Sequence, residues 1–258
     1  MSHLQCRKYL FNIVFTHSKK SDAFGCFEKG VNIIKNIYHS NIRFVRLDGE
    51  TSFGTNFENF VSKQGIKPER TAPDTLAQNG GSERAGRTII TKSRSLCVEA
   101  GLPTDLWPEV VKAAGYISNR TPIRKLEWKT PYEQVTKNAI KYAHMHIYGC
   151  KAYALNHHIP RREKMEPRAH IGYLVGYDST NIYQIWIPSR QRVIRTRDVT
   201  FDDNALYIPS DLDIGAILPE ETEELVNAIE LDKNHVYNKE NNILDMTIIK
   251  IPPIIRLI

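Results

Sequence analysis

The chain has 258 residues, of which 41% are hydrophobic and 25% are charged, an ordinary globular composition with enough length for two modest cores. The formal net charge is +6, and residues 201–230 hold nine acids and no Lys or Arg, so the positive charge is concentrated in the first 200 residues. A basic body with an acidic tail indicates a polyanionic partner. No apolar run approaches the roughly 18 residues of a membrane span, so no membrane partner is expected. The four cysteines lack C-x-x-C spacing, which favours reduced thiols in an intracellular compartment.

The first 72 residues alternate strand and helix patterns. The predicted elements are a strand over 9–15, a helix over 22–38, an alternating strand over 42–47, a short helix over 55–63 and an edge strand over 66–72. The order strand, helix, strand predicts a parallel crossover in an α/β sheet, whose ligands lie at the carboxyl ends of the strands. Asp48 follows such an end.

A long helix is predicted to start near Ser82, after a polar loop over 73–81 that contains two glycines. Its apolar positions fall on one stripe, and Glu83 falls on the opposite side with Arg87 and Arg94. Glu83 then has two interpretations. It is either a first-turn carboxylate favoured by the helix dipole and by Arg87, or a metal-binding carboxylate on a surface that faces phosphate. The local sequence leaves both open.

The rest of the chain changes character at about residue 146. A helix is predicted over 105–119, and then four short strands separated by turn residues predict a small β-barrel, at 148–155, 170–177, 182–187 and 192–199. Beyond residue 203 the pattern indicates an acidic linker or a disordered tail. The tryptophans at 107, 128 and 186 are interpreted as packing residues rather than as base-stacking platforms.

Several motifs in sequence order carry a family resemblance. The series VRLDGET (45–51), GIKPERTAP (65–73), QNGGSERAGR (78–87), AGLPTDLWPE (100–109) and NRTP (119–122) resembles the integrase core of copia-type LTR retrotransposon Gag-Pol polyproteins, most closely their fungal branch. The later series YGCKAY (148–153), KMEPRAHIGYLVGY (164–177), IWIP (185–188) and TRDVTFDD (196–203) resembles the SH3-like barrel that follows this core. The resemblance implies three regions: a partial ribonuclease H-like catalytic core at 1–140, an SH3-like barrel at 146–205 and a linker or tail at 206–258.

The resemblance also implies a chemistry. Such integrases use two Asp and one Glu to hold divalent ions, Mg²⁺ or Mn²⁺, that drive trimming of a DNA 3′ end and its transfer into target DNA. Asp48 matches the second aspartate and Glu83 the glutamate, 35 positions later. The first aspartate has no counterpart, and the chain is expected to be truncated at its N-terminus relative to the family. Metal binding is therefore expected to be weak or absent, and whether the chain is an enzyme stays undecided.

The same resemblance also implies binding partners. DNA is expected, as element ends and host target, with RNA as an alternative, and the parent integrases act as homo-oligomers in the nucleus after assembly in cytoplasmic virus-like particles. The candidate nucleic-acid-binding residues are Asn79, Arg84, Arg87, Lys92 and Arg94 on the long helix, and Arg161, Arg162, Lys164 and Arg168 in a basic loop. Three alternatives remain: a solvated basic face, a nucleic-acid-binding module without chemistry, or a non-functional relic of a decayed element.

Overall fold

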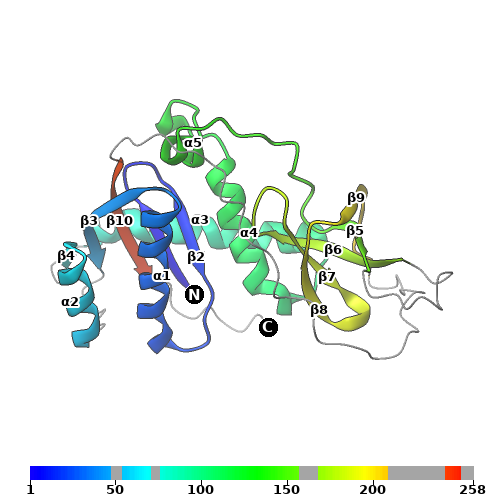
Figure 1. The fold of residues 1–258 in the computed structure, drawn as a ribbon, viewed down its shortest axis with the longest axis horizontal. Coiled ribbons are helices and arrows are strands. Elements are labelled where there is room, and N and C mark those ends of the chain that lie inside the picture. Colours follow the sequence, from blue (N-terminus) through cyan, green and yellow to red (C-terminus); the bar gives the residue numbers. More distant parts are fainter. Residues whose placement is uncertain (48–53, 71–75, 157–167, 209–241, 251–258) are drawn as a thin grey trace. The chain divides into compact units, whose positions relative to one another are not determined.

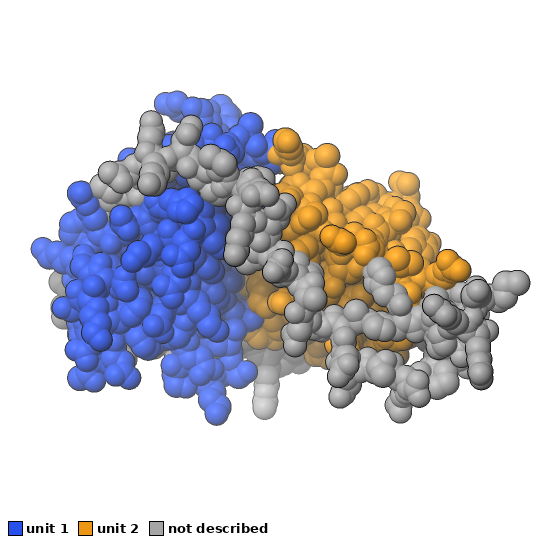
Figure 2. All heavy atoms as spheres, viewed as in Figure 1, with its two compact units in different colours: residues 1–92, 114–140, 238–258 blue, residues 93–113, 141–237 orange. Residues whose placement is uncertain are grey.

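The computed structural model describes residues 1–47, 54–70, 76–156, 168–208 and 242–250 (Figure 1). The chain divides into two compact units (Figure 2), and each contains its own sheet. Unit 1 comprises residues 1–92, 114–140 and 238–258, and unit 2 comprises residues 93–113 and 141–237. Unit 1 mixes helices with a mixed sheet, whereas the sheet of unit 2 is wholly antiparallel. The predicted succession of an α/β core and a small all-β domain is confirmed.

The sheet of unit 1 has the strand order β2-β1-β10-β3-β4. Its strands are β1 (Ser2–Cys6), β2 (Asn12–Phe15), β3 (Ser40–Leu47), β4 (Lys67–Arg70) and β10 (Asn242–Lys250). β1 runs antiparallel to both β2 and β10, whereas β3 runs parallel to both β10 and β4. β2 and β3, which flank the first helix in the sequence, therefore run in the same direction. The parallel crossover predicted from the sequence is confirmed, with two other strands between its members.

Two of these strands were not predicted. The first eight residues were assigned no element, yet Ser2–Cys6 pairs with β2 in a tight hairpin. The region beyond residue 206 was expected to be a linker or disordered tail, yet Asn242–Lys250 forms β10 and pairs along both of its edges, with Ser2 to Cys6 on one side and with β3 on the other. The intervening residues 209–241 lie outside the described ones. A strand from the C-terminal region is thus the central strand of unit 1.

Helices cover both faces of this sheet. α1 (Ala23–Asn36) and α3 (Leu76–Ala100) lie on opposite faces (Figure 1). α2 (Gly54–Lys63) and α5 (Pro131–Thr136) also belong to unit 1, and α4 (Trp107–Arg120), like α3, contributes residues to both units. One core joins α1, α2, β1 and β3 through the fully buried side chains of Phe27, Ile34, Phe57, Leu4 and Leu47. The predicted boundaries of α1 and α2 agree with the structure to within two residues.

A buried polar network ties the β1-β2 hairpin to α4. His3 Nε2 lies 2.8 Å from Asn12 Oδ1, and the Asn12 backbone N–H donates to Asn119 Oδ1 at 2.7 Å. Asn119 Nδ2 in turn donates to the Asn12 carbonyl at 2.7 Å. Burial lowers the pKa of His3 to about 4, against the raising effect of its hydrogen bond to Asn12. The ring is therefore neutral in the folded protein, which suits its complete burial.

The sheet of unit 2 has the order β8-β7-β6-β5-β9, in which all neighbours are antiparallel. Its strands are β5 (Cys150–Leu155), β6 (Ala169–Tyr177), β7 (Tyr183–Ile187), β8 (Arg192–Thr196) and β9 (Val199–Leu206). The strand predicted over 192–199 is confirmed as β8 but ends three residues early, at Thr196, and the chain continues as β9, which was not predicted, on the other side of β5. Gly172 lets β6 and β7 approach closely, because a Cβ there would lie 2.5 Å from Ile185 Cγ2. Tyr173 and Trp186 fill the core.

Candidate functional site

Glu83 lies on α3, with its side chain exposed. The predicted helix start near Ser82 is wrong, because α3 begins at Leu76 and runs through Asn79, Gly80 and Gly81. Glu83 is thus about two turns inside the helix. The influence of the helix dipole is confined to the first turn, so the interpretation of Glu83 as a helix-start charge loses its main physical basis.

The predicted orientation of this helix is confirmed. Ile89 and Ala100 are 2% and 1% exposed, whereas Glu83, Arg87 and Arg94 are exposed. Glu83 and Arg87 therefore face solvent on the half of α3 that belongs to unit 1. Exposed guanidinium groups on a solvent-facing helix can bind phosphate, and an exposed carboxylate can offer oxygen ligands to a divalent cation.

Asp48, the other predicted metal ligand, lies outside the described residues. The structure describes β3 up to Leu47, the residue before it. β3 and β4 pair in parallel up to Leu47 and Arg70, so the carboxyl ends of both strands lie at the same edge of the sheet. Within the described ranges, no group of three or more His, Cys, Asp or Glu side chains is placed to hold a metal ion. The assignment of Asp48 and Glu83 as metal and catalytic residues stays a prediction.

The candidate phosphate-binding residues fall into different surroundings. Arg84, Arg87 and Arg94 on α3 are exposed, and so is Arg168, the residue before β6. Lys92 is half-buried, and its Nζ donates to Ser118 Oγ on α4 at 3.1 Å. Burial lowers the pKa of Lys92. Lys92 thus helps to fix α3 against α4, a role that the sequence did not indicate.

Four other candidates lie wholly or partly outside the described residues. Arg161, Arg162 and Lys164 lie outside the described residues, and nothing is described of the Asn79 side chain, although its backbone belongs to α3. These residues stay predicted nucleic-acid contacts. The same applies to the basic loop as a whole, of which Arg168 is the last residue.

The turn between α4 and α5 holds a residue that the sequence interpretation missed. Trp128 is 70% exposed, and Trp107 is 47% exposed, so the packing interpretation is wrong for both, whereas Trp186, at 3%, confirms it. Trp128 and the preceding Glu127 both have positive φ, 64° and 55°. The only sequence signal was the composition of RKLEWK (124–129), an aromatic residue among three basic ones.

In unit 2, hydrogen bonds to Asp203 anchor the segment that leads into β5. His146 Nδ1 lies 3.0 Å from Asp203 Oδ2, and the Ile147 N–H donates to Asp203 Oδ1 at 2.9 Å. The His146 ring stacks on Phe201 with centroids 4.0 Å apart. Burial by itself raises the pKa of Asp203, but the hydrogen bonds from His146 and Ile147 outweigh it and leave that pKa below its usual value. These contacts are structural and hold no reactive group in an open cleft.

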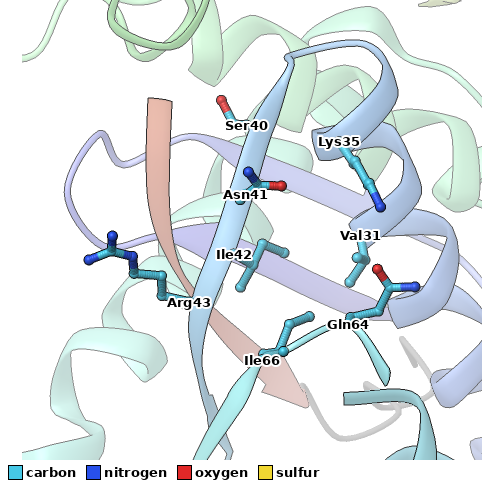
Figure 3. A pocket seen from close by; sticks show the side chains of 9 residues that line it. Val31, Lys35, Ser40, Asn41, Ile42, Arg43, Gln64 and Ile66 are labelled. Carbon is cyan, nitrogen blue, oxygen red and sulfur yellow. The ribbon is translucent and has the colours of Figure 1, made fainter. Parts of the chain in front are cut away.

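A hollow of about 160 Å³ lies at the amino end of β3 (Figure 3). Val31, Ile42 and Ile66 provide apolar lining, and Lys35 and Arg43 extend to opposite sides of β3. This is the opposite end of the strand from Leu47, which precedes Asp48. Among the helices that the structure describes, none has the length and apolar character required to cross a membrane.

Comparison with known proteins identifies relatives of both units. Residues 150–213 match the retroviral polymerase SH3-like domain family. Over 203 residues, 77% of this chain, the sequence is 31% identical to the retrovirus-related Pol polyprotein from transposon TNT 1-94 of Nicotiana tabacum. It is 27% identical over 72% of its length to the corresponding polyprotein from transposon RE1 of Arabidopsis thaliana. The matched segments span 15% and 13% of these relatives.

Among solved structures, the chain resembles a chain of the simian T-cell lymphotropic virus intasome in complex with PP2A regulatory subunit B56 gamma. The two share 11% sequence identity with a TM-score of 0.40, over 77% of this chain and 68% of the other. The sequence relationships confirm the expected resemblance to retrotransposon Pol polyproteins.

Proposed function

We propose that this chain, related over most of its length to a segment of retrotransposon Pol polyproteins, is a copia-type integrase region that binds DNA and holds an incomplete metal site. The observation that carries the proposal is the arrangement of α3: Glu83 and the arginines at 84 and 87 are all exposed on the part of α3 that belongs to the α/β unit, and an SH3-like domain follows in the sequence. Positive charge on a solvent-facing helix neutralises backbone phosphates independently of base sequence.

Asp48 and Glu83 are the residues that would hold Mg²⁺ or Mn²⁺. Both provide hard carboxylate oxygens, the donors that these ions prefer, and the exposed position of Glu83 leaves its carboxylate accessible to an ion from solvent. A bound ion would activate a water or a DNA 3′-hydroxyl and stabilise the leaving oxygen of a phosphodiester. Arg84 and Arg87 would position the adjacent phosphates. With two of the three carboxylates of the family pattern matched, the ion is held weakly and joining of DNA ends does not proceed.

The metal site is tested by titrating Mn²⁺ into the purified chain in a calorimeter. We expect weak binding that is lost in Glu83→Gln and retained in Glu99→Gln, an exposed glutamate on the same helix. The companion assay incubates the chain with oligonucleotides that end in the element's terminal sequence and with plasmid target. Absence of joined product supports the incomplete site. Robust joining that disappears in Glu83→Gln, and not in Glu99→Gln, overturns it and makes the chain an active integrase.

Binding without chemistry is the second function that a specific observation favours, because the exposed arginines of α3 require no metal to bind phosphate. A salt titration of DNA affinity tests it: Arg87→Gln should flatten the slope of log affinity against log salt concentration by about one unit. Lys35→Gln, an exposed charge on α1 across the sheet, is the matched control and should leave the slope unchanged. An affinity that is independent of salt, together with the lack of a cooperative unfolding transition, would instead identify a relic.

Access to host DNA places the proposed site of action in the nucleus, and the parent proteins' oligomerisation makes self-association part of the proposal. Fluorescence microscopy of the tagged chain and analytical ultracentrifugation with and without DNA test these two points. Exclusion from the nucleus, or a monomer at all concentrations with DNA bound, would count against them. RNA of the same length provides a competing ligand in the same binding assay.

A further inference from the structure

The turn of residues 123–129, between α4 and α5, is closed by its own backbone. The Ile123 N–H donates to the Lys129 carbonyl at 3.1 Å, and the Trp128 N–H donates back to the Ile123 carbonyl at 3.1 Å. The short 3₁₀ helix Arg124–Leu126 spans its tip. Opposite hydrogen bonds between the ends of a seven-residue segment leave its backbone little freedom. The conformation of the turn is thus fixed rather than variable.

Both ends of the turn are attached to rigid structure. At the α4 end, the Arg120 guanidinium lies 3.4 Å from the centroid of the Tyr116 ring and 4.5 Å from that of Tyr132, which belongs to α5. At the α5 end, Thr130 and Glu133 form a capping box in which Thr130 Oγ1 accepts from the Glu133 N–H at 3.1 Å. The turn is therefore presented on a fixed base.

Trp128 is held in this turn in an unfavourable backbone conformation. Left-handed φ is unfavourable for a residue with a side chain, and a bulky residue there is an outlier. Glu127 and Trp128 adopt it in succession. The ring recovers little by packing, because 70% of Trp128 is exposed. Strain without compensating burial is typical of residues kept for an interaction with another molecule.

The charged residues around Trp128 indicate which class of molecule would bind to the turn. Arg124, Lys125 and Lys129 are exposed beside it, and Glu127 is the only acid in the turn. An aromatic ring flanked by cations matches a nucleic-acid strand whose bases are unpaired, because the ring stacks on a base while the cations neutralise the adjacent phosphates. A duplex keeps its bases stacked on one another and offers the ring no face.

We propose that the turn of residues 123–129 is a binding site for single-stranded nucleic acid, in which Trp128 stacks on an unpaired base and Arg124, Lys125 and Lys129 bind the flanking phosphates. This inference rests on the proposed nucleic-acid binding and adds to it a second group of residues, on the turn between α4 and α5, that distinguishes single strands from duplex. Stacking recognises any base, so the site has no strong sequence preference.

The first test measures affinity of the full-length chain for labelled oligothymidylate, oligouridylate and a DNA duplex of equal length. Trp128→Ala should weaken binding of the single strands by about tenfold or more, leave the duplex affinity unchanged and leave the salt slope unchanged, since no phosphate contact is removed. The more tightly bound single strand identifies DNA or RNA as the source. Trp107→Ala, the other exposed tryptophan, flanked by Asp105 and Glu109, is the matched control and should leave the single-strand affinity unchanged.

The second test separates interaction from packing. Glycine adopts φ near 64° without strain, so Trp128→Gly should raise the unfolding temperature by up to about 2–4 °C while it abolishes the single-strand preference. Glu127→Gly relieves the same strain with the ring retained, and should raise the unfolding temperature and keep the preference. A marked fall in the unfolding temperature of Trp128→Gly would show that the ring packs, and would overturn the proposal.

The outcomes also separate this inference from the proposed function. A wild-type chain that binds no nucleic acid overturns both. Salt-dependent binding that Trp128→Ala leaves intact, or weakens equally for single strand and duplex, overturns the Trp128 site alone and leaves the α3 surface standing.

Discussion

The two sheets of this protein contain five strands each, but they differ in how far apart in the sequence their paired strands lie. In unit 2, β5 to β8 occupy consecutive positions in the sheet, and only β9 crosses over to pair with β5. In unit 1, the central strand β10 is separated from its partners β1 and β3 by most of the chain. Unit 2 is thus stabilised mainly by contacts between neighbours in sequence, whereas unit 1 depends on one distant segment. The two units should therefore respond differently to the same kind of change.

The largest effect is expected from a substitution in β10 that disrupts unit 1. Thr247→Pro removes a ladder hydrogen bond from the centre of the sheet, where proline is not tolerated, and should abolish the cooperative unfolding of unit 1. Hydrogen exchange followed by mass spectrometry should show lost protection in β1 and β3 and preserved protection in β6 and β7. Thr247→Val keeps the backbone donor and the β-branched shape and should exchange like the wild type. Protected β1 amides in Thr247→Pro would contradict the central role of β10.

The next prediction concerns a buried side chain in the sheet of unit 2. Ile185 on β7 is fully buried, so Ile185→Ala should cost about 2–5 kcal/mol of stability through lost burial and the cavity left behind. Calorimetry should show the unit 2 transition at a lower temperature, with the unit 1 transition in place. Ile185→Val, which removes one methylene group, should cost about 0.5–1.5 kcal/mol. A joint shift of both transitions would show that the units unfold as one.

The pH dependence distinguishes the units through His3. The pKa of His3 is lowered from 6.5 to about 4 by burial, so the unfolded chain takes up a proton as pH falls through 6.5 while the folded chain stays neutral until about pH 4. Unit 1 should therefore lose stability between these values, by a total on the order of 3 kcal/mol, and His3 should contribute no loss above pH 6.5. Urea unfolding monitored across this range measures the loss. His3→Gln, which does not titrate, should flatten the curve.

The smallest effect tests a local contribution inside unit 1. Thr130→Ala removes the cap of α5 and should cost about 1 kcal/mol, since one helix-terminal N–H loses its acceptor. Thr130→Ser keeps the hydroxyl and should behave almost like the wild type in a thermal melt. A loss as large as that of Thr247→Pro would mean that local and distant contacts are not separable in this unit.

The elements that could be predicted from the sequence follow the same division between near and distant contacts. α1, α2 and the strands β5 to β7 were predicted because their apolar residues recur at helix or strand spacing and meet partners nearby. β1 was missed because His3 and Gln5 gave it a polar pattern, and their hydrogen bonds to Asn12 are visible only in the folded protein. β10 was missed because its partners lie at the other end of the chain. The start of α3 was misplaced because a single helix runs through Gly80 and Gly81, against their local preference.

For the candidate site, the sequence predicted the residue types and the helix face but not the backbone. The exposed side of α3 followed from its period, which placed Glu83 and Arg87 correctly. The burial of Lys92 against Ser118 required the crossing of two helices, which no local pattern encodes. The exposure of Trp128 required positive φ at two successive residues without glycine, a conformation that sequence preferences argue against.

The central position of β10 also sets an order of events during synthesis. The barrel strands β5 to β9 can pair as soon as residue 206 has left the ribosome, whereas β1 and β3 must wait for residues 242–250. During that interval, each presents an edge with unpaired N–H and C=O groups, the kind of edge that recruits strands from other molecules. The α/β unit is therefore the last part to mature although most of it is made first, and chaperone dependence and aggregation of the nascent chain should both originate there.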